Sequence, residues 1–201
     1  MSAKADLERL LRRPPGVRRT AGLVSWFQGL YPGDVVPAVL VGGGAVELLT
    51  GGGYVTGDLD FVGEVPRVVA AALRECGLER RGRHWIHEAG RLFLEIPGRR
   101  IEPPSEPVQL EVEGRKVWVM APEALLADRL AAWKFWRSEI DAANALRLVQ
   151  KTGRTMNGRL AARLARELEV EDERRRLLRF AGRLRGRPPT GEELARWTKK
   201  K

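Results

Sequence analysis

Two aspartates near the middle of the chain have a spacing that could hold a metal ion. Asp58 and Asp60 flank Leu59 in the stretch TGDLDFV, residues 56–62. Because alternate residues of a strand project to the same side, the two carboxylates should lie together while Leu59 and Phe61 face a core. Adjacent carboxylates repel each other unless a cation lies between them, and hard oxygen ligands select Mg²⁺ or Mn²⁺. The pair therefore predicts a divalent-metal site.

A glycine-rich turn upstream supplies the complementary feature. The stretch VLVGGGA, residues 39–45, is a buried strand that ends in glycines and opens a helix. Backbone N–H groups at such a junction are free to hold phosphate, and Gly42 and Gly43 let the backbone approach a ligand closely. With Thr56 they are the nucleotide-binding candidates of this half. Phosphates at the helix start and metals on the aspartates together would suit nucleotidyl transfer.

The elements that must position these residues follow from hydrophobic periodicity and from glycine and proline breaks. Strands are expected at 35–41, 59–62, 84–87, 91–96, 108–113 and 116–120, the last two as a hairpin. Helices are expected at 6–12, 20–30, 45–49, 66–76, 122–137, 139–151, 157–167, 171–183 and 192–197, and 97–107 is expected to be loop. The fold class is therefore mixed α/β followed by an all-helical region, divided into residues 1–121 and 122–201.

The order of these motifs resembles the nucleotidyltransferase superfamily typified by DNA polymerase beta, in which a Gly-Gly or Gly-Ser turn begins a helix and an Asp-x-Asp strand follows. Within it, the stretches APEALLADRL (121–130) and DAANAL (141–146) are similar to the AbiEii-type toxin branch. The resemblance covers roughly residues 35–150. It implies a nucleotidyltransferase-type core, a nucleoside triphosphate, Mg²⁺ or Mn²⁺, and, in that branch, a cognate antitoxin protein.

The resemblance also implies a third carboxylate on a neighbouring strand. Glu95 in LFLEI is the first candidate, because a glutamate flanked by apolar residues requires a partner, and Glu111 in QLEV is the second. The chain departs from the superfamily in the long interval between Gly43 and Asp58 and in having glutamate at the third position. The two-metal site could therefore be incomplete, leaving a protein that binds nucleotide without turning it over.

The helix expected at 122–137 offers a cation to the triphosphate. Similar proteins present basic side chains there, and Lys134 is the candidate; the alternative is a surface pair with Asp128 or Asp141. The neighbouring aromatic residues Trp133, Phe135 and Trp136 could stack on a base or could form a helix–helix seam.

Charge favours a polyanionic partner. The chain carries a net charge of +10, and residues 154–201 hold 15 lysines and arginines against 7 acidic residues. Arg159, Arg163 and Arg166 should share one helix face and the leucines between them another. The abundance of arginine with little asparagine or glutamine is also typical of a thermophile or a GC-rich genome, which would raise the charge without any role in nucleic-acid binding.

Other compositional features exclude several classes of protein. One cysteine, Cys76, rules out an internal disulfide, and His84 and His87 should point to opposite faces of an extended segment, which makes a zinc site improbable. No apolar run approaches the roughly 20 residues of a membrane span. The charged start of the chain lacks the pattern of a signal peptide, so a cytoplasmic location is expected.

The function predicted from the sequence is metal-dependent transfer of a nucleotidyl group from a nucleoside triphosphate to an acceptor. Asp58, Asp60 and Glu95 would be catalytic and would ligate the metal. RNA, and tRNA in particular, would be the acceptor, with a toxin or phage-defence role. Two alternatives stay open: a small-molecule or protein acceptor, and a non-catalytic module that binds nucleotide or RNA on a degenerate fold.

Overall fold

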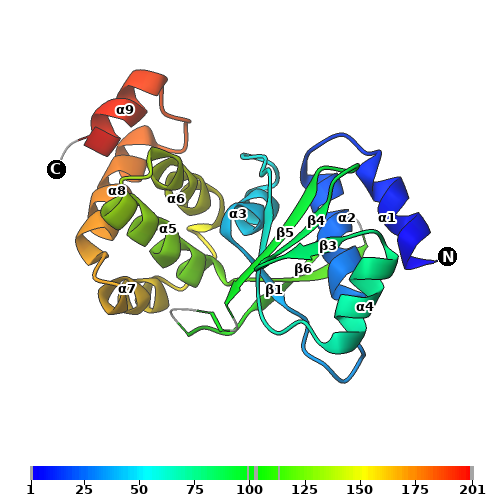
Figure 1. The fold of residues 1–201 in the computed structure, drawn as a ribbon. Helices are drawn as coiled ribbons and strands as arrows, with labels where there is room; N and C mark the ends of the chain where they lie inside the picture. Colours follow the sequence, from blue (N-terminus) through cyan, green and yellow to red (C-terminus); the bar gives the residue numbers. More distant parts are fainter. Residues whose placement is uncertain (1, 99, 102–103, 113, 200–201) are drawn as a thin grey trace. The chain divides into compact units, whose positions relative to one another are not determined.

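The structure, a computed structural model, describes residues 2–98, 100–101, 104–112 and 114–199 (Figure 1). The chain divides into two compact units, Met1–Ile101 with Ser105–Met120 and Glu102–Pro104 with Ala121–Lys201. The first unit holds a mixed sheet, and the second consists of helices. The fold class expected from the sequence, a mixed α/β core followed by a helical region, is confirmed.

One sheet contains the seven strands of the described residues. The strands are β1 (Val39–Val41), β2 (Leu59–Val62), β3 (Glu79–Arg81), β4 (His84–His87), β5 (Leu92–Gly98), β6 (Val108–Val112) and β7 (Arg115–Val119). Their order across the sheet is β3-β4-β5-β2-β1-β7-β6. β2 therefore lies in the middle, between β1 and β5. It runs antiparallel to β1 and parallel to β5.

Nine helices accompany the sheet in the described part of the chain. They are α1 (Ala3–Leu11), α2 (Val17–Gln28), α3 (Gly42–Thr50), α4 (Arg67–Glu75), α5 (Pro122–Trp136), α6 (Glu139–Thr152), α7 (Gly158–Glu167), α8 (Glu171–Leu184) and α9 (Gly191–Lys199). None of these described helices is both long and apolar enough to cross a bilayer.

Helices α2 and α3 cover one face of the central strands. A Cβ atom built on Gly44 of α3 would lie 3.2 Å from the Leu59 side chain, and the ring of Phe27 in α2 is 4.5 Å from that of Phe61. Leu59 and Phe61 are buried and Asp60 between them is only partly buried, as strand alternation predicts. The aspartate face of β2 is therefore the face opposite to α2 and α3.

Gln28 ties α2 to the sheet. Its side-chain amide donates hydrogen bonds to the carbonyls of Ala38 (2.9 Å) and Trp118 (2.8 Å), and its carbonyl accepts one from the Trp118 N–H (2.8 Å). The side chain is buried, so its polar groups require these partners. The result is a fixed position for α2 at the β1–β7 side of the sheet.

The second unit is a helical cluster with its own core. Its centre is formed by buried side chains of α5, α6, α7, α8 and α9, including Leu130, Leu146, Leu177 and Trp197. Trp197 packs against Trp133 and stacks on Phe180, with ring centroids 4.6 Å and 4.8 Å away. The helix–helix seam expected for Trp133 is confirmed, whereas Phe135 and Trp136 are exposed.

Helices α1 and α2 each begin three residues before their expected starts, and four further local differences separate the structure from the expected elements. The first strand is shorter than predicted, because residues 32–35 form a turn, and α3 begins at Gly42, before the predicted start. β5 continues into the expected loop as far as Gly98. The fourth, strand β3, was not predicted, because its sequence Glu-Arg-Arg is fully exposed and has no apolar alternation.

Candidate active site

The junction between β1 and α3 places a glycine directly against one of the two aspartates. Val41 is paired with Asp60 across the β1–β2 ladder, and Gly42 follows it at once as the first residue of α3. A Cβ atom on Gly42 would lie only 2.3 Å from Asp60 Oδ2. Gly42 also has a φ of +62°, a conformation that favours glycine. Both observations require glycine at this position.

The start of α3 leaves backbone donors beside this carboxylate. Its N-cap, Val41, provides no side-chain hydrogen bond, so the first N–H groups of α3, those of Gly42 and Gly43 among them, have no partner within the helix. Such groups favour anions because they lie at the positive end of the helix dipole. The phosphate-binding expectation for Gly42 and Gly43 therefore rests on a real helix start.

Thr56 connects α3 to the loop that carries Asp58. A Cβ on Gly43 would lie 3.0 Å from the Thr56 hydroxyl oxygen, so the two residues are neighbours. The Thr56 hydroxyl donates to the Asp58 carbonyl (2.8 Å), and the Thr56 N–H donates to Glu47 Oε2 (3.1 Å). These contacts brace the peptide from which Asp58 projects.

Glu47 is a part of the site that sequence reasoning missed. It lies in α3 with no exposed surface, and the same Oε2 atom also accepts a hydrogen bond from the Thr20 hydroxyl (3.1 Å). Its Oε1 atom is buried with no partner among the described residues. Burial raises the pKa of the Glu47 carboxyl, partly offset by the hydrogen bonds from Thr56 and Thr20. A single acid within the apolar run AVELL was the available signal.

The parallel pairing of β2 and β5 brings Glu95 beside Asp60. The two residues are register partners, so their side chains lie on the same face of the sheet. Glu111 lies on β6 at the opposite edge, with β1 and β7 between it and β2. Of the two candidates for the third carboxylate, only Glu95 is adjacent to the aspartates.

Glu95 already has a cationic partner, Arg83, and a histidine neighbour. Its Oε1 atom is 2.7 Å from Arg83 Nε, and its Oε2 atom is 3.4 Å from His84 Nε2. His84 is the register partner of Glu95 on β4, whereas His87 lies on the other face, where it lines a pocket, so the opposite orientation of the two histidines is confirmed. No motif of the sequence indicates that Arg83 pairs with this glutamate.

The two aspartates offer oxygen ligands to a divalent cation. Asp60 is half-buried on β2, whereas the exposed Asp58 lies at a bend just before the strand, so the expected placement of both aspartates on one strand holds for Asp60 alone. Their hard oxygens match Mg²⁺ or Mn²⁺. Across the described residues, no three His, Cys, Asp or Glu side chains are close enough to hold a metal ion as they stand. Asp58 and Asp60 therefore fit such an ion in chemistry, and Glu95, the register partner of Asp60, is paired with Arg83.

Lys134 belongs to the second unit. Its side chain is exposed, donates to the Glu169 carbonyl, and lies 5.1 Å from the centre of the Phe135 ring. The alternative of a pair with Asp128 or Asp141 is wrong, because Arg129 binds both of these carboxylates, Asp141 at 2.6 Å. Lys134 stays a nucleotide-binding prediction.

Several C-terminal arginines have structural partners. Glu171 pairs with Arg174 (2.7 Å) and Arg175 (2.9 Å), and the Arg176 guanidinium lies 4.8 Å from the centre of the Trp133 ring. The arginines of α7 differ, because Arg159 and Arg166 are exposed and have no ion pair among the described residues. The expected polar face of α7 is confirmed, with Leu164 fully buried on its other side.

Comparison with known proteins supports the fold. No protein-family model and no curated protein matches the chain. Among solved structures, it is similar to the crystal structure of an antigenic nucleotidyltransferase-like protein from Paracoccidioides brasiliensis, with a TM-score of 0.57 and 17% sequence identity over 91% of this chain and 95% of that chain. The fold is nucleotidyltransferase-like. This agrees with the superfamily resemblance of the glycine turn and the Asp-x-Asp strand.

Proposed function

We propose that the chain is a metal-dependent nucleotidyltransferase that transfers a nucleotidyl group from a nucleoside triphosphate to an acceptor. The observation that carries the proposal is the contact between Gly42 and Asp60. It sets a helix start able to hold phosphate beside a carboxylate able to hold a metal ion. The nucleotidyltransferase-like fold supports the same assignment.

The residues of the site have distinct tasks in this reaction. The backbone N–H groups of Gly42 and Gly43 would bind the phosphates, and Asp58 and Asp60 would hold Mg²⁺ or Mn²⁺. When bound, this ion neutralises charge on the phosphates. The acceptor oxygen forms a bond to the α-phosphorus as the bond to the β-phosphate oxygen breaks, and pyrophosphate leaves. Glu95 would accept the proton of the acceptor hydroxyl.

RNA, with tRNA as the first case to test, is the proposed acceptor. The exposed arginines of α7 carry this part of the proposal, because phosphate contacts dominate the affinity for nucleic acid. A toxin or phage-defence role with a cognate antitoxin, as in the AbiEii-type branch, is part of the same proposal. It predicts that expression arrests growth and that Asp58→Ala relieves the arrest.

The ion pair between Glu95 and Arg83 favours a second candidate function. A site whose third carboxylate stays neutralised would bind nucleotide or RNA without transferring a nucleotidyl group. The two functions differ in one observable, the appearance of nucleotide on an acceptor.

The experiment that tests the proposal is a labelling assay. The protein is incubated with total tRNA, Mg²⁺ or Mn²⁺, and each α-labelled nucleoside triphosphate in turn. Asp60→Asn should abolish transfer, whereas Glu111→Gln, on an exposed edge strand, should leave it intact. Triphosphate binding without transfer to RNA, to a small aminoglycoside or to protein would favour the binding module instead.

A further inference from the structure

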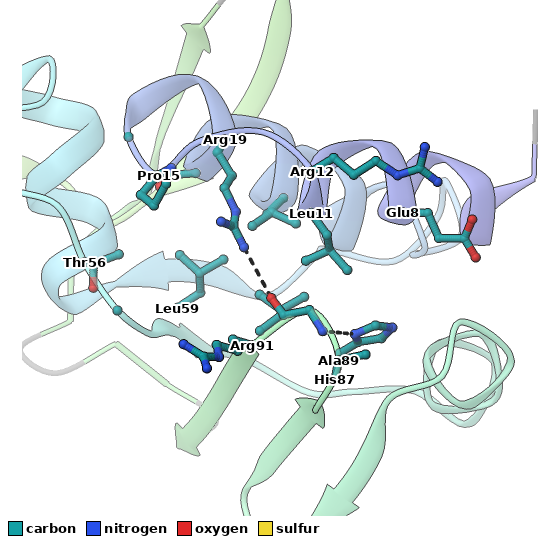
Figure 2. A pocket seen from close by; sticks show the side chains of 16 residues that line it. Glu8, Leu11, Arg12, Pro15, Arg19, Thr56, Leu59, His87, Ala89 and Arg91 are labelled. Atoms are coloured by element: carbon teal, nitrogen blue, oxygen red, sulfur yellow. Dashed lines mark hydrogen bonds between the residues drawn. The ribbon is translucent and has the colours of Figure 1, made fainter.

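A second site is suggested by a pocket on the other face of the sheet. The pocket has a volume of about 540 Å³ and lies wholly within the first unit (Figure 2). Three segments form it: the α1–α2 region, the stretch around Gly57, and the turn between β4 and β5. Its volume is within the range of roughly 300–1,000 Å³ that is common for small-molecule sites.

The pocket is not the proposed transfer site. Leu59 lines it, and in an extended strand Leu59 projects away from the side to which Asp58 and Asp60 project. The two sites nevertheless share a segment, since Thr56 and Gly57 line the pocket and immediately precede Asp58. A ligand in the pocket would therefore contact the loop that carries the first aspartate.

The charged groups of the pocket are predominantly positive. Arg12, Arg19 and Arg91 line it, and Glu8 is the acid among its lining residues. None of the three arginines forms an ion pair with any residue that the structure describes. Unbalanced guanidinium groups around a cavity favour an anion, and arginine is suited to bidentate binding of phosphate.

Arg19 is the best placed of the three. It is half-buried, and its guanidinium donates only long hydrogen bonds, 3.3 Å to the Arg13 carbonyl and 3.4 Å to the Gly90 carbonyl. In Figure 2 a dashed line marks the hydrogen bond from Arg19 to the Gly90 carbonyl, and Arg12 and Arg91 are drawn on opposite sides of it. Neutral carbonyls at these distances leave most of its hydrogen-bonding capacity for a ligand.

The turn that faces Arg19 is held rigidly. The Gly90 N–H donates to His87 Nδ1 (2.9 Å), and a Cβ on Gly90 would lie 2.4 Å from a methyl group of Leu11. Arg91 has a φ of +46°, which is costly for a residue with a side chain. This turn places the Arg91 cation at the pocket edge.

The rest of the lining is apolar. Leu11, Leu23, Leu59 and Leu92 line the pocket together with Pro15. An inorganic anion alone would leave the apolar surface that these side chains present to the pocket in contact with water, whereas a phosphate ester with a ring would cover it. From this combination we propose that the pocket binds a small phosphate monoester, with its phosphate at Arg19 and its ring on the leucines.

The test is binding of adenosine monophosphate by calorimetry in the presence of a chelator, which keeps the metal-dependent site out of the measurement. We expect saturable binding that Arg19→Met and Arg91→Met each weaken by about tenfold or more. Arg67→Met, which removes an exposed arginine of α4 outside the pocket, and Asp60→Asn should bind as the unaltered protein does.

Each outcome decides the inference independently of the proposed function, because no transfer is measured. Absence of saturable binding would overturn the inference. So would folded Arg19→Met and Arg91→Met variants that bind adenosine monophosphate as tightly as the unaltered protein does. Equal affinity for inorganic phosphate would also overturn it, since the ring would then contribute nothing. Loss of binding in Asp60→Asn would place the nucleotide at the aspartates instead of in the pocket. Arg91 is exposed, so its variant keeps the test valid should Arg19→Met fail to fold.

Discussion

At the scale of single residues, two glycines of α3 form a matched pair. Gly42 begins the helix with a φ of +62° and Gly51 caps its end with a φ of +68°. Their backbone conformations are almost the same, but a Cβ on Gly51 would meet nothing within 4 Å, whereas one on Gly42 would meet Asp60. A substitution at Gly51 therefore causes backbone strain alone, whereas the same substitution at Gly42 causes strain and also displaces the Asp60 carboxylate.

We predict that Gly42→Ala abolishes metal-dependent binding of a nucleoside triphosphate, while Gly51→Ala retains it. Both substitutions should cost about 1–2 kcal/mol of stability from strain alone. Only the first also moves the Asp60 carboxylate. Urea unfolding measures the strain, and nucleotide titration in Mn²⁺ measures the site. Equal loss of binding in both variants would mean that strain, not the carboxylate contact, is responsible.

Glu47 supports a prediction about pH. Burial raises the pKa of its carboxyl in the folded protein above the ordinary value of 4.5. The folded state therefore binds the proton more tightly than the unfolded chain does. The stability contributed by this group is full below the unfolded pKa and is lost as pH rises through the folded pKa.

The free energy of unfolding of the unaltered protein should thus fall, relative to that of Glu47→Gln, as pH rises from about 4 toward neutrality. The amide keeps an acceptor for Thr56 and Thr20 but does not titrate in this range. Urea denaturation at several pH values measures the difference, with the exposed Glu111→Gln as control. Parallel curves for the unaltered protein and Glu47→Gln would contradict the predicted role of burial.

At the scale of elements, strand β2 shows what the sequence could predict. The alternation of Asp58, Leu59, Asp60 and Phe61 specifies which side chains are buried without reference to any partner, because strand periodicity is local. Which strand pairs with β2 is not a local property. That Glu95 lies opposite Asp60 depends on a parallel pairing across an intervening helix and hairpin, and the sequence indicated it only through the superfamily resemblance.

The partners of the buried and paired polar groups had no local signal. Glu47 appears in the sequence as one acid in an apolar helix, and its partners Thr20 and Thr56 come from separate segments. The pairing of Arg83 with Glu95 likewise follows from the β4–β5 turn and not from any motif. Buried polar contacts between distant segments are therefore the part of the candidate site that required the structure.

The start of α8 allows an acid-stability prediction. Glu171 accepts hydrogen bonds from Arg174 and Arg175, which lower its pKa to about 2. A lowered folded pKa gives stability that is present above the unfolded value and is lost as pH falls through the folded value. Glu171→Gln should therefore lower stability at neutral pH by about 1 kcal/mol, since the pairs are partly screened.

This difference should shrink as pH falls toward 2 and vanish below it, because the carboxyl is protonated in both states only below its folded pKa of about 2. Thermal unfolding at neutral and acid pH measures the effect. Glu167→Gln, which removes one exposed contact of 3.5 Å to Arg163, should have a smaller effect at either pH. A Glu171 effect that persists unchanged in acid would show that packing, not charge, stabilises this helix start.

At the scale of the whole molecule, the excess of positive charge is shared between two kinds of arginine. Those of α8, such as Arg174 and Arg175, are paired with Glu171 and stabilise the helical unit. Those of α7 extend from an amphipathic helix whose buried side packs in the core, and Arg159 and Arg166 have no ion pair among the described residues. Net charge alone therefore overstates how much of the surface is available to RNA.

The last prediction uses this distinction. If RNA binds through the α7 face, the triple substitution of Arg159, Arg163 and Arg166 by Gln should weaken tRNA binding. The slope of log affinity against log salt concentration should also become shallower by about 2, because fewer phosphate contacts form and fewer counterions are released. Replacement of Arg174 and Arg175 by Gln removes two positive charges but should change the slope less, since both cations already pair with Glu171. Binding measured from low to moderate salt distinguishes the two. Equal changes of slope would indicate that the field of the whole molecule, and not the α7 face, attracts the RNA.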